Sequence, residues 1–257
     1  MAGPVLRPLS LGEMLDVSFG LYRNLFVPLL VVTIVTRAVP LVLSVYLESA
    51  GGGLSNPALY FASLVLSAVL SAIAAGASTF IVAENYMGRQ ITAGEAFRRA
   101  TPFTGRLISL AIMTTLLCGL AFILLIIPGA IVGTGLALGT PALVLENKSV
   151  ASDAMGRSWA LTRGYRWKLF IALAVVIFLV ALPFLSLGVY AAASIPAGSP
   201  PAVGDLAGFL GFTIVAALLQ TLIYPLLYCL LTVAYYDLRV RKEAFDLEVL
   251  AAGLTAA

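Results

Sequence analysis

The sequence contains no histidine and few charged residues. Of its 257 residues, 11% are charged and 61% are hydrophobic, whereas a soluble domain is about one quarter charged. The mean hydropathy is +1.06, and no segment has the length and polarity of a separate soluble domain. These values exclude an ordinary soluble domain and indicate a polytopic membrane protein with short loops. The missing histidine removes the most common general base, metal ligand and pH-sensitive group.

Cysteine is also scarce, and recognisable catalytic motifs are missing. Cys118 and Cys229 both lie within apolar runs, so we expect small buried apolar residues rather than a disulfide or a metal pair. The sequence contains no Walker loop, nucleophile elbow, metal-ligand cluster or nucleic-acid motif. It therefore predicts no catalytic residue, no cofactor, no metal site and no nucleic-acid partner.

Six apolar stretches are close to the ~20 residues that a membrane-spanning helix needs. When they are drawn as spans, every Lys and Arg except Arg37 falls on one side. Basic loops stay in the cytoplasm, so the pattern predicts a multi-pass protein of the cytoplasmic membrane with both termini cytoplasmic. The fourth stretch is short, which leaves open whether it crosses or turns back. The predicted spans are residues 26–47, 58–83, 107–127, 129–145, 168–193 and 207–235.

The predicted outer connections are short and nearly uncharged. Residues 48–57 and 194–206 are rich in Gly and Pro and contain Glu48 and Asp205, the two acids expected outside. The stretch Ile127-Pro128-Gly129 is predicted to be a tight outer turn between the third and fourth spans.

The cytoplasmic segments repeat along the chain. Ser10 with Glu13, and Thr92 with Glu95, match the capping box of a helix start, and a similar segment begins near Ser152. Each segment is expected to form an interfacial amphipathic helix before a pair of spans. The predicted fold class is therefore an all-α integral membrane protein made of one domain with three hairpin units. The units are residues 8–83, 92–146 and 149–237, followed by a cytoplasmic tail at 238–257.

Three stretches give the chain a resemblance to a known family. They are residues 6–13 (LRPLSLGE) with 21–23 (LYR), residues 141–146 (PALVLE) with 157–159 (RSW), and residues 235–243 (YYDLRVRKE) with 245–248 (FDLE). Together they resemble the membrane domain associated with some bacterial glycerophosphoryl diester phosphodiesterases. The resemblance implies the membrane part alone, because the family's phosphodiesterase activity belongs to a separate barrel domain that uses histidines. No catalytic residue is therefore expected in this chain.

Arg37 is the sharpest candidate for a functional residue. It lies about eleven residues into the first span, hence ~16 Å deep at 1.5 Å per residue, where a charge costs roughly 2.5–3.5 kcal/mol. In a structural interpretation, Pro40 frees the carbonyl of Thr36, and loose carbonyls and hydroxyls satisfy Arg37. In a functional interpretation, its guanidinium binds an anionic group such as a lipid phosphate.

Tyr224, Tyr228 and Gln220 lie one turn apart on one face of the sixth predicted span, and Tyr224 is at a depth similar to that of Arg37. They either line a polar cleft or make ordinary hydrogen bonds between helices.

Basic and aromatic residues are mixed at the entrance to the fifth predicted span. They either bind anionic lipid headgroups, at about 1 kcal/mol per basic residue, or simply set the topology of the chain. This candidate headgroup set is Arg157, Trp159, Arg163, Arg166, Trp167 and Lys168.

Glu84, Glu146 and Asp237 occupy equivalent positions, where the second, fourth and sixth spans reach the cytoplasm. Paired carboxylates can perform acid–base chemistry, but we expect these to be structural partners of basic residues in the interfacial layer.

The sequence thus predicts a non-enzymatic inner-membrane protein that organises lipids or partner proteins. Its expected partners are membrane lipids, including anionic ones, and a protein on the cytoplasmic face. The alternative is a transporter or lipid-translocating protein with Arg37 near an intramembrane site for an anionic group. An enzyme acting on lipid headgroups is disfavoured by the lack of histidine and of clustered acids.

Overall fold

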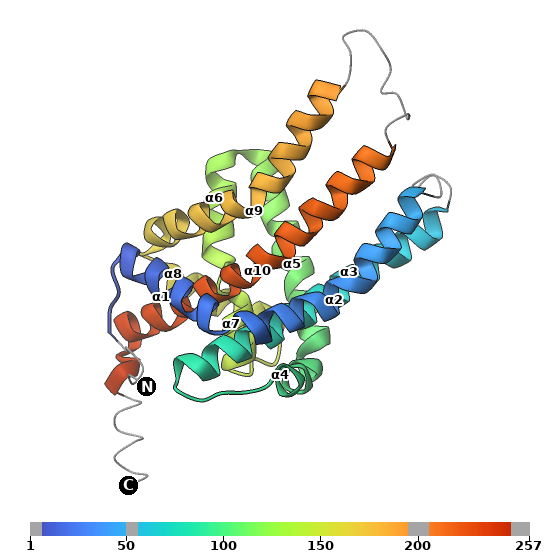
Figure 1. Cartoon of the computed structure of the whole chain (residues 1–257). Coiled ribbons are helices and arrows are strands. Elements are labelled where there is room, and N and C mark those ends of the chain that lie inside the picture. The colour runs from blue at the N-terminus through green and yellow to red at the C-terminus, as the bar shows by residue number, and fades with distance from the viewer. Residues whose placement is uncertain (1–6, 50–55, 195–205, 248–257) are drawn as a thin grey trace.

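The computed structural model describes residues 7–49, 56–194 and 206–247 (Figure 1). Within these ranges some side chains of the helices Phe26–Ser49, Arg166–Ser194 and Leu206–Glu243, including those of Glu48 and Gln220, lie outside the description. The predicted outer loops 48–57 and 194–206, except for their helical ends, and the last ten tail residues also lie outside it. The described chain is helical throughout, which confirms the all-α prediction.

Five helical stretches among the described residues are long and apolar enough to cross a membrane. They are Phe26–Leu47, Pro57–Tyr86, Ala93–Leu124, Ile126–Leu145 and Ala217–Glu243. They overlap all the predicted spans except residues 168–193, which fall in helix α9 (Arg166–Ser194). The membrane-protein class is therefore supported, whereas six full spans stay a prediction.

The first unit begins with the short helix α1 (Leu11–Asn24). The predicted capping box is present, because Ser10 Oγ accepts from the Glu13 N–H and Glu13 accepts from the Ser10 N–H. Leu25 caps the C-terminal end of α1, and α2 (Phe26–Ser49) begins at the next residue. α3 (Pro57–Tyr86) returns along α2, starting at an Asn56 cap.

A turn with Gly88 at a φ of 81° leads from α3 to α4 (Ala93–Ala100). Thr92 caps α4 as predicted, but only half of the expected box is present. The Glu95 carboxylate pairs with Arg99 one turn along α4. The short 3₁₀ helix η2 (Thr101–Phe103) then leads into α5 (Thr104–Leu124).

The turn between α5 and α6 (Ile126–Leu136) is not at Ile127-Pro128-Gly129. The break is one extended residue, Leu125, and the predicted turn residues form the first turn of α6. Proline is tolerated there because the first N–H groups of a helix lack intrahelical partners. Gly129 lets the two arms approach, since a Cβ there would lie 2.4 Å from the Phe122 ring.

The fourth predicted span is broken into α6 and α7 (Gly139–Leu145). Pro141 has no N–H to continue the helical ladder, so the backbone opens at Ala137 and Leu138. Ser158 of α8 (Ala151–Thr162) bridges the gap. Its hydroxyl donates to the Gly135 carbonyl at 2.7 Å and accepts from the Leu138 N–H at 3.1 Å.

Gly164, with a φ of 89°, turns the chain from α8 into α9. The last long helix is α10 (Leu206–Glu243), which contains Pro225 and continues beyond the predicted end of the span at residue 235. The first residues of the predicted tail are therefore helical. Phe245 then folds back and stacks on Tyr236 with ring centroids 5.7 Å apart.

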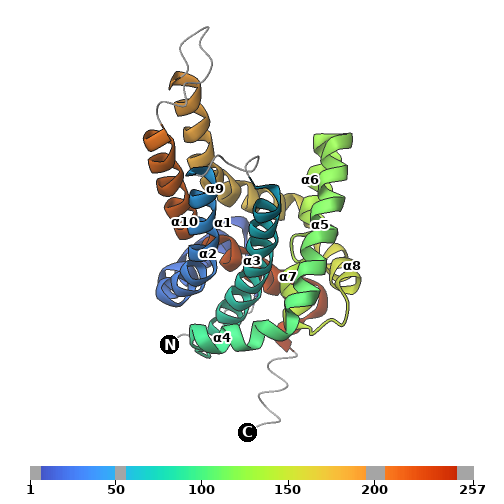
Figure 2. The same ribbon diagram turned by 90° about the vertical axis from the view of Figure 1, so that its right-hand side faces the viewer.

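The helices share a packed layer and then separate. The largest buried cluster joins α1, α9 and α10, and includes Met14, Leu169, Leu230 and Tyr235. Two further clusters join α2 with α3 and α4, and α5 with α7 and α8. Beyond that layer, α5 and α6 stand apart from α9 and α10 (Figure 2). The separated parts expose mainly apolar side chains.

Candidate functional site

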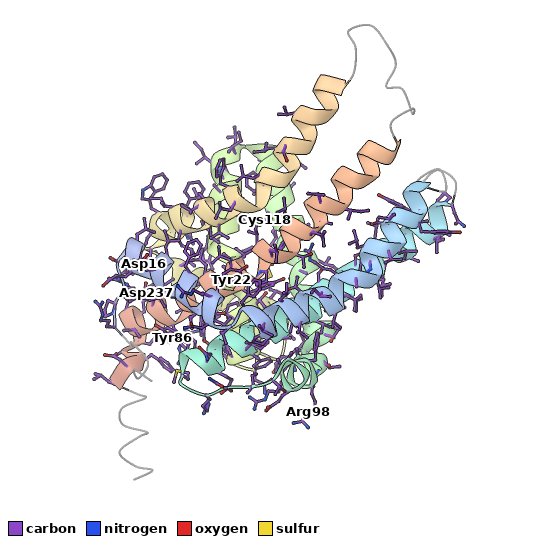
Figure 3. All side chains as sticks on the ribbon, in the orientation of Figure 1. Asp16, Tyr22, Tyr86, Arg98, Cys118 and Asp237 are labelled. Atoms are coloured by element: carbon purple, nitrogen blue, oxygen red, sulfur yellow. The ribbon has the colours of Figure 1, made fainter. Side chains whose placement is uncertain are left out.

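The three predicted carboxylates are held by basic partners in the layer that contains the short helices. Glu84 accepts from Arg89 at 2.5 Å and from Arg99 at 2.9 Å. The Glu84 side chain is 16% exposed, whereas that of Asp237 is fully buried. Figure 3 labels Asp237 on α10 and Arg98 on the short helix α4. This layer therefore concentrates the charge pairs that the sequence predicted.

Glu146 is the centre of a second network. Its carboxylate accepts from Arg157 Nε at 2.6 Å, from the Tyr235 hydroxyl at 2.7 Å, and pairs with Lys148 at 3.1 Å. Burial alone would raise the pKa of Glu146, but hydrogen bonds from these three donors hold it below its ordinary value. Arg157 also binds Glu243 of α10, and this hydrogen bond raises the pKa of the Arg157 guanidinium. The network ties α7 and α8 to α10.

Asp237 joins the two ends of the chain. Its Oδ1 accepts from the Leu9 N–H at 2.7 Å and its Oδ2 accepts from Lys168 Nζ at 2.8 Å. Arg241 adds a third donor at 3.1 Å. Lys168 and Arg241 also donate to the Leu9 carbonyl, each at 2.5 Å. One buried carboxylate thus fixes the start of α1 against α9 and α10.

The partners of Glu84 and Glu146 occupy similar positions in their helices. Glu84 binds Arg99 of α4, and Glu146 binds Arg157 of α8. Arg99 is the seventh residue of α4, and Arg157 is the seventh residue of α8. Asp237 instead binds the backbone just before α1. Glu84 and Glu146 therefore each contact the short helix that follows them in the chain, whereas Asp237 contacts the start of the described chain.

The structure divides the candidate headgroup set into two groups. Arg157 and Lys168 are paired with carboxylates inside the protein. Arg163 is exposed, and Arg166 stacks over Trp159 with its Cζ 3.6 Å from the ring centroid. Trp167 is 73% exposed and stacks on Phe170. Only the second group is open to an external ligand.

Arg166 and Trp167 stand at one end of an apolar groove between α6 and α9. A pocket of about 300 Å³ is lined by both residues and by α6 residues from Ile126 to Thr134. It shares Ile126, Ala130, Thr134 and Phe170 with a second pocket of about 650 Å³ that continues to α10. The Arg166 Nε is buried and has no hydrogen-bond partner among the described residues. We call the two pockets together the α6–α9 groove.

These pockets also bear on the predicted topology. The sequence placed Ile127 at the outer surface and Arg166 at the cytoplasmic surface. Both now line one pocket. Its α6 lining runs only from Ile126 to Thr134, about 12 Å of helix at 1.5 Å per residue, whereas a hydrocarbon layer is about 30 Å thick. The two residues therefore cannot lie on opposite membrane faces.

Arg37 lies beside Tyr224, as their similar depth predicted. The guanidinium carbon is 4.0 Å from the centroid of the Tyr224 ring. Among the described residues, this ring contact is the interaction found for Arg37, with no ion pair and no hydrogen bond, and both interpretations of Arg37 stay predictions. Nearby, Tyr22 donates to the Leu222 carbonyl at 2.7 Å, next to the Pro225 interruption. The Gln220 side chain lies outside the description, and Tyr228 is partly buried one turn from Tyr224.

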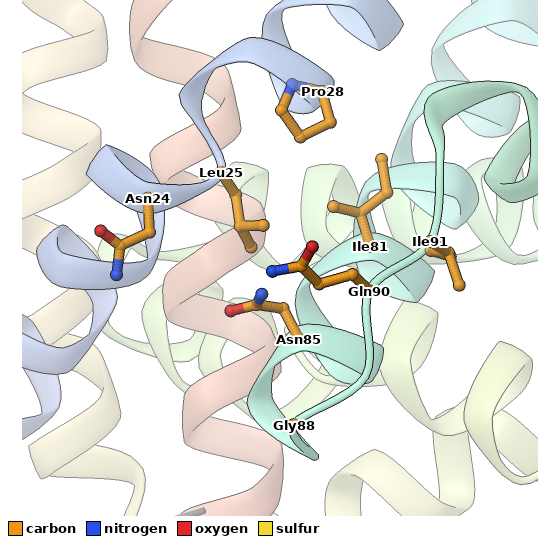
Figure 4. A pocket seen from close by; sticks show the side chains of 8 residues that line it. All are labelled: Asn24, Leu25, Pro28, Ile81, Asn85, Gly88, Gln90 and Ile91. Atoms are coloured by element: carbon orange, nitrogen blue, oxygen red, sulfur yellow. The ribbon is translucent and has the colours of Figure 1, made fainter. Parts of the chain in front are cut away.

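A further pocket was not predicted from the sequence. It has a volume of about 620 Å³ and lies between the α1–α2 junction and the turn after α3. Three carboxamides line it, from Asn24, Asn85 and Gln90, and Figure 4 shows those of Asn85 and Gln90 side by side. The signal was present as amides flanking two span ends, but nothing local showed that the ends would meet.

No family model, curated protein or solved structure matches this chain. Its function must therefore be argued from its own geometry.

Proposed function

We propose that this chain is a non-enzymatic protein of the bacterial inner membrane that holds an anionic phospholipid in the α6–α9 groove. The phosphate would bind at Arg166, and an acyl chain would lie along α9. The observation that carries the proposal is the buried Nε of Arg166, which has no hydrogen-bond partner among the described residues and lies beside an almost wholly apolar groove. Guanidinium suits phosphate geometry, and the groove accepts hydrocarbon.

The neighbouring side chains support the same ligand. Trp159 holds one face of the Arg166 guanidinium, while Arg163 and Trp167 are exposed nearby. Basic and aromatic side chains of this kind favour the headgroup level of a bilayer. In this arrangement α2, α3, α9 and α10 cross the membrane, and the short helices and both termini face the cytoplasm.

A scaffold role fits the paired charges of the cytoplasmic layer. Glu84, Glu146 and Asp237 are each occupied by basic partners and are not arranged as an acid–base pair. The resemblance to a phosphodiesterase-associated membrane domain, which lacks the catalytic barrel, leads to the same proposal. A protein partner would dock on this layer.

The proposal can be tested by native mass spectrometry of the full chain released from nanodiscs of phosphatidylglycerol and phosphatidylcholine. We expect one phosphatidylglycerol to be retained per chain. Arg166→Gln should abolish that retention. Arg98→Gln removes the same charge from an exposed position on α4 and should leave it intact. Equal retention by both variants, or no preference for phosphatidylglycerol, would contradict the proposal.

A second candidate function is translocation of an anionic amphiphile past Arg37. It is favoured by the absence of any ion pair or hydrogen bond to Arg37 within the described part of the chain. The test is movement of a fluorescent phosphatidylglycerol between leaflets of proteoliposomes. We expect Arg37→Gln to stop movement and Arg37→Lys to restore part of it. Unchanged movement in a folded Arg37→Gln protein would remove this candidate.

A further inference from the structure

The tip of the α5–α6 hairpin is made of large apolar side chains. Residues 122–127 read FILLII, and all six are at least half exposed. Ile123 is 83% exposed and Ile126 is 77% exposed. A turn at a water-facing surface normally contains Gly, Pro, Asn or other polar residues, as the predicted outer loops do. This tip therefore belongs in hydrocarbon rather than in water.

The backbone of the tip is compatible with hydrocarbon. Polar backbone groups in lipid need internal partners. Leu125, the one non-helical residue, donates its N–H to the Ala121 carbonyl at 3.1 Å and accepts from the Gly129 N–H at 3.1 Å. Pro128 has no N–H to satisfy. The extended residue of the turn is thus paired on both sides, while the N–H groups of Ile126 and Ile127 are, within the described ranges, the usual unpaired donors of a helix start.

The two arms of the hairpin differ in length: α5 has 21 residues and is long enough to cross, so the limit on its reach comes from α6. α6 has 11 residues, or about 16 Å at 1.5 Å per residue, which is roughly half of a hydrocarbon layer about 30 Å thick. Its lower end is anchored to α8 by Ser158, and α7 is buried in the protein. In both views α9 continues well beyond the hairpin tip (Figures 1 and 2).

The side chains beside the hairpin fix its level. Ile126 and Ile127 share a pocket with Arg166 and Trp167. A charge at the bilayer centre is strongly disfavoured, and Arg and Trp favour the interface. With Arg166 at the cytoplasmic interface, the hairpin tip lies only a short distance further into the hydrocarbon layer.

We propose that the α5–α6 hairpin is a wedge that enters and leaves the bilayer from the cytoplasmic side. It contacts the acyl chains of the cytoplasmic leaflet and ends near the bilayer centre. The wedge displaces lipid from one leaflet only, and it forms one wall of the α6–α9 groove. The inference uses the membrane orientation proposed above but does not require lipid retention in the groove.

The test measures depth at the tip in the full-length protein, in a background with Cys118→Ala and Cys229→Ala. A nitroxide on Ile127→Cys in phosphatidylglycerol–phosphatidylcholine vesicles should show high oxygen accessibility and little accessibility to a water-soluble nickel chelate. An impermeant maleimide added outside intact cells should leave this cysteine unlabelled. Ala58→Cys, at the exposed start of α3, is the outer control and should be labelled.

Labelling of Ile127→Cys from outside to the level of Ala58→Cys would overturn the wedge. High accessibility of the nitroxide at Ile127→Cys to the nickel chelate would overturn it too. If Ile127→Cys does not fold, the same measurements on Ile123→Cys decide the matter. Lipid retention is read separately by mass spectrometry. The two measurements are independent. A protein that retains no lipid but has its hairpin tip in hydrocarbon can be told from one that retains lipid but has its tip at the outer surface.

Discussion

Lys168 and Arg166 lie two residues apart at the start of α9 but have different surroundings. Lys168 donates to the buried Asp237 carboxylate and to the Leu9 carbonyl. Arg166 stacks on Trp159 and leaves its buried Nε without a partner among the described residues. Arg157 resembles Lys168, since two carboxylates hold it. Neighbouring basic residues thus differ in whether a carboxylate of the protein holds them, and in the proposed function those without such a partner bind the lipid.

The largest expected effect is that of Asp237→Asn, which removes the carboxylate partner of Lys168. The variant leaves Lys168 and Arg241 in a buried site without a counter-charge. Breaking one half of such a buried pair destabilises a protein by about 3–5 kcal/mol. Thermal unfolding in detergent should show this loss. Asp153→Asn, at an exposed position on α8, should cost about 0.5 kcal/mol or less, and equal losses would contradict the distinction.

Glu146→Gln should have the next largest effect, because it removes the charge that Arg157, Lys148 and Tyr235 share. Hydrogen bonds to charged groups contribute about 1.5–3 kcal/mol, so we expect a loss of that order at pH 7. The pKa of Glu146 is lowered in the folded protein from 4.5. Its contribution is therefore fully present above pH 4.5 and is lost as the pH falls through the folded pKa.

The pH dependence gives this prediction a separate check. The difference in melting temperature between wild type and Glu146→Gln should be largest near neutral pH and should shrink below pH 4.5. A difference that stays constant down to pH 3.5 would show that Glu146 contributes through shape rather than charge.

Gly135→Ala tests the other half of the comparison, the support of Arg166 by the Trp159 ring. A Cβ at Gly135 would lie 2.4 Å from a Trp159 ring carbon, so the ring that carries Arg166 must move. Overpacking of this kind costs about 1–3 kcal/mol, and phosphatidylglycerol retention should fall with it. Gly119→Ala on α5 is the matched control, because nothing lies within 4 Å of its added Cβ and it does not line the groove. Equal behaviour of the two variants would show that the Trp159 platform is dispensable.

Trp167→Ala should have the smallest effect on stability. The side chain is 73% exposed and its described ring contact is with Phe170. The free energy of unfolding should therefore change by about 0.5 kcal/mol or less. The Kd for phosphatidylglycerol should rise about twofold to fivefold, which corresponds to an aromatic contact of about 0.5–1 kcal/mol. Titration of the lipid into nanodisc-bound protein measures this. A large loss of stability with unchanged affinity would assign Trp167 to the fold.

Local signals in the sequence predicted the helices well. The Ser10 capping box, the Thr92 cap and the long apolar helices all depend on neighbouring residues, and all are present. The position of the α5–α6 turn was wrong because a Pro-Gly pair also fits the first turn of a helix. The break between α6 and α7 was missed because Ser158, which satisfies it, lies about twenty residues away.

Contacts between distant segments were predictable only in part. Counting residues from the cytoplasmic ends placed Arg37 and Tyr224 at similar depth, and they lie in contact. The same counting identified Glu84, Glu146 and Asp237 as equivalent. It could not show that Asp237 binds Leu9, 228 residues earlier. Nor could it separate Arg166 from Lys168, since partner choice depends on which way each side chain of α9 faces.

The most direct test of this account compares Arg166→Gln with Lys168→Gln in one experiment that records melting temperature and bound phosphatidylglycerol. The account predicts opposite outcomes. Arg166→Gln should lose the lipid and melt close to wild type, whereas Lys168→Gln should melt lower, since it exposes the Asp237 charge, and should retain lipid while folded. If both variants lose lipid and stability together, or neither loses lipid, the proposed division between fold and ligand is contradicted.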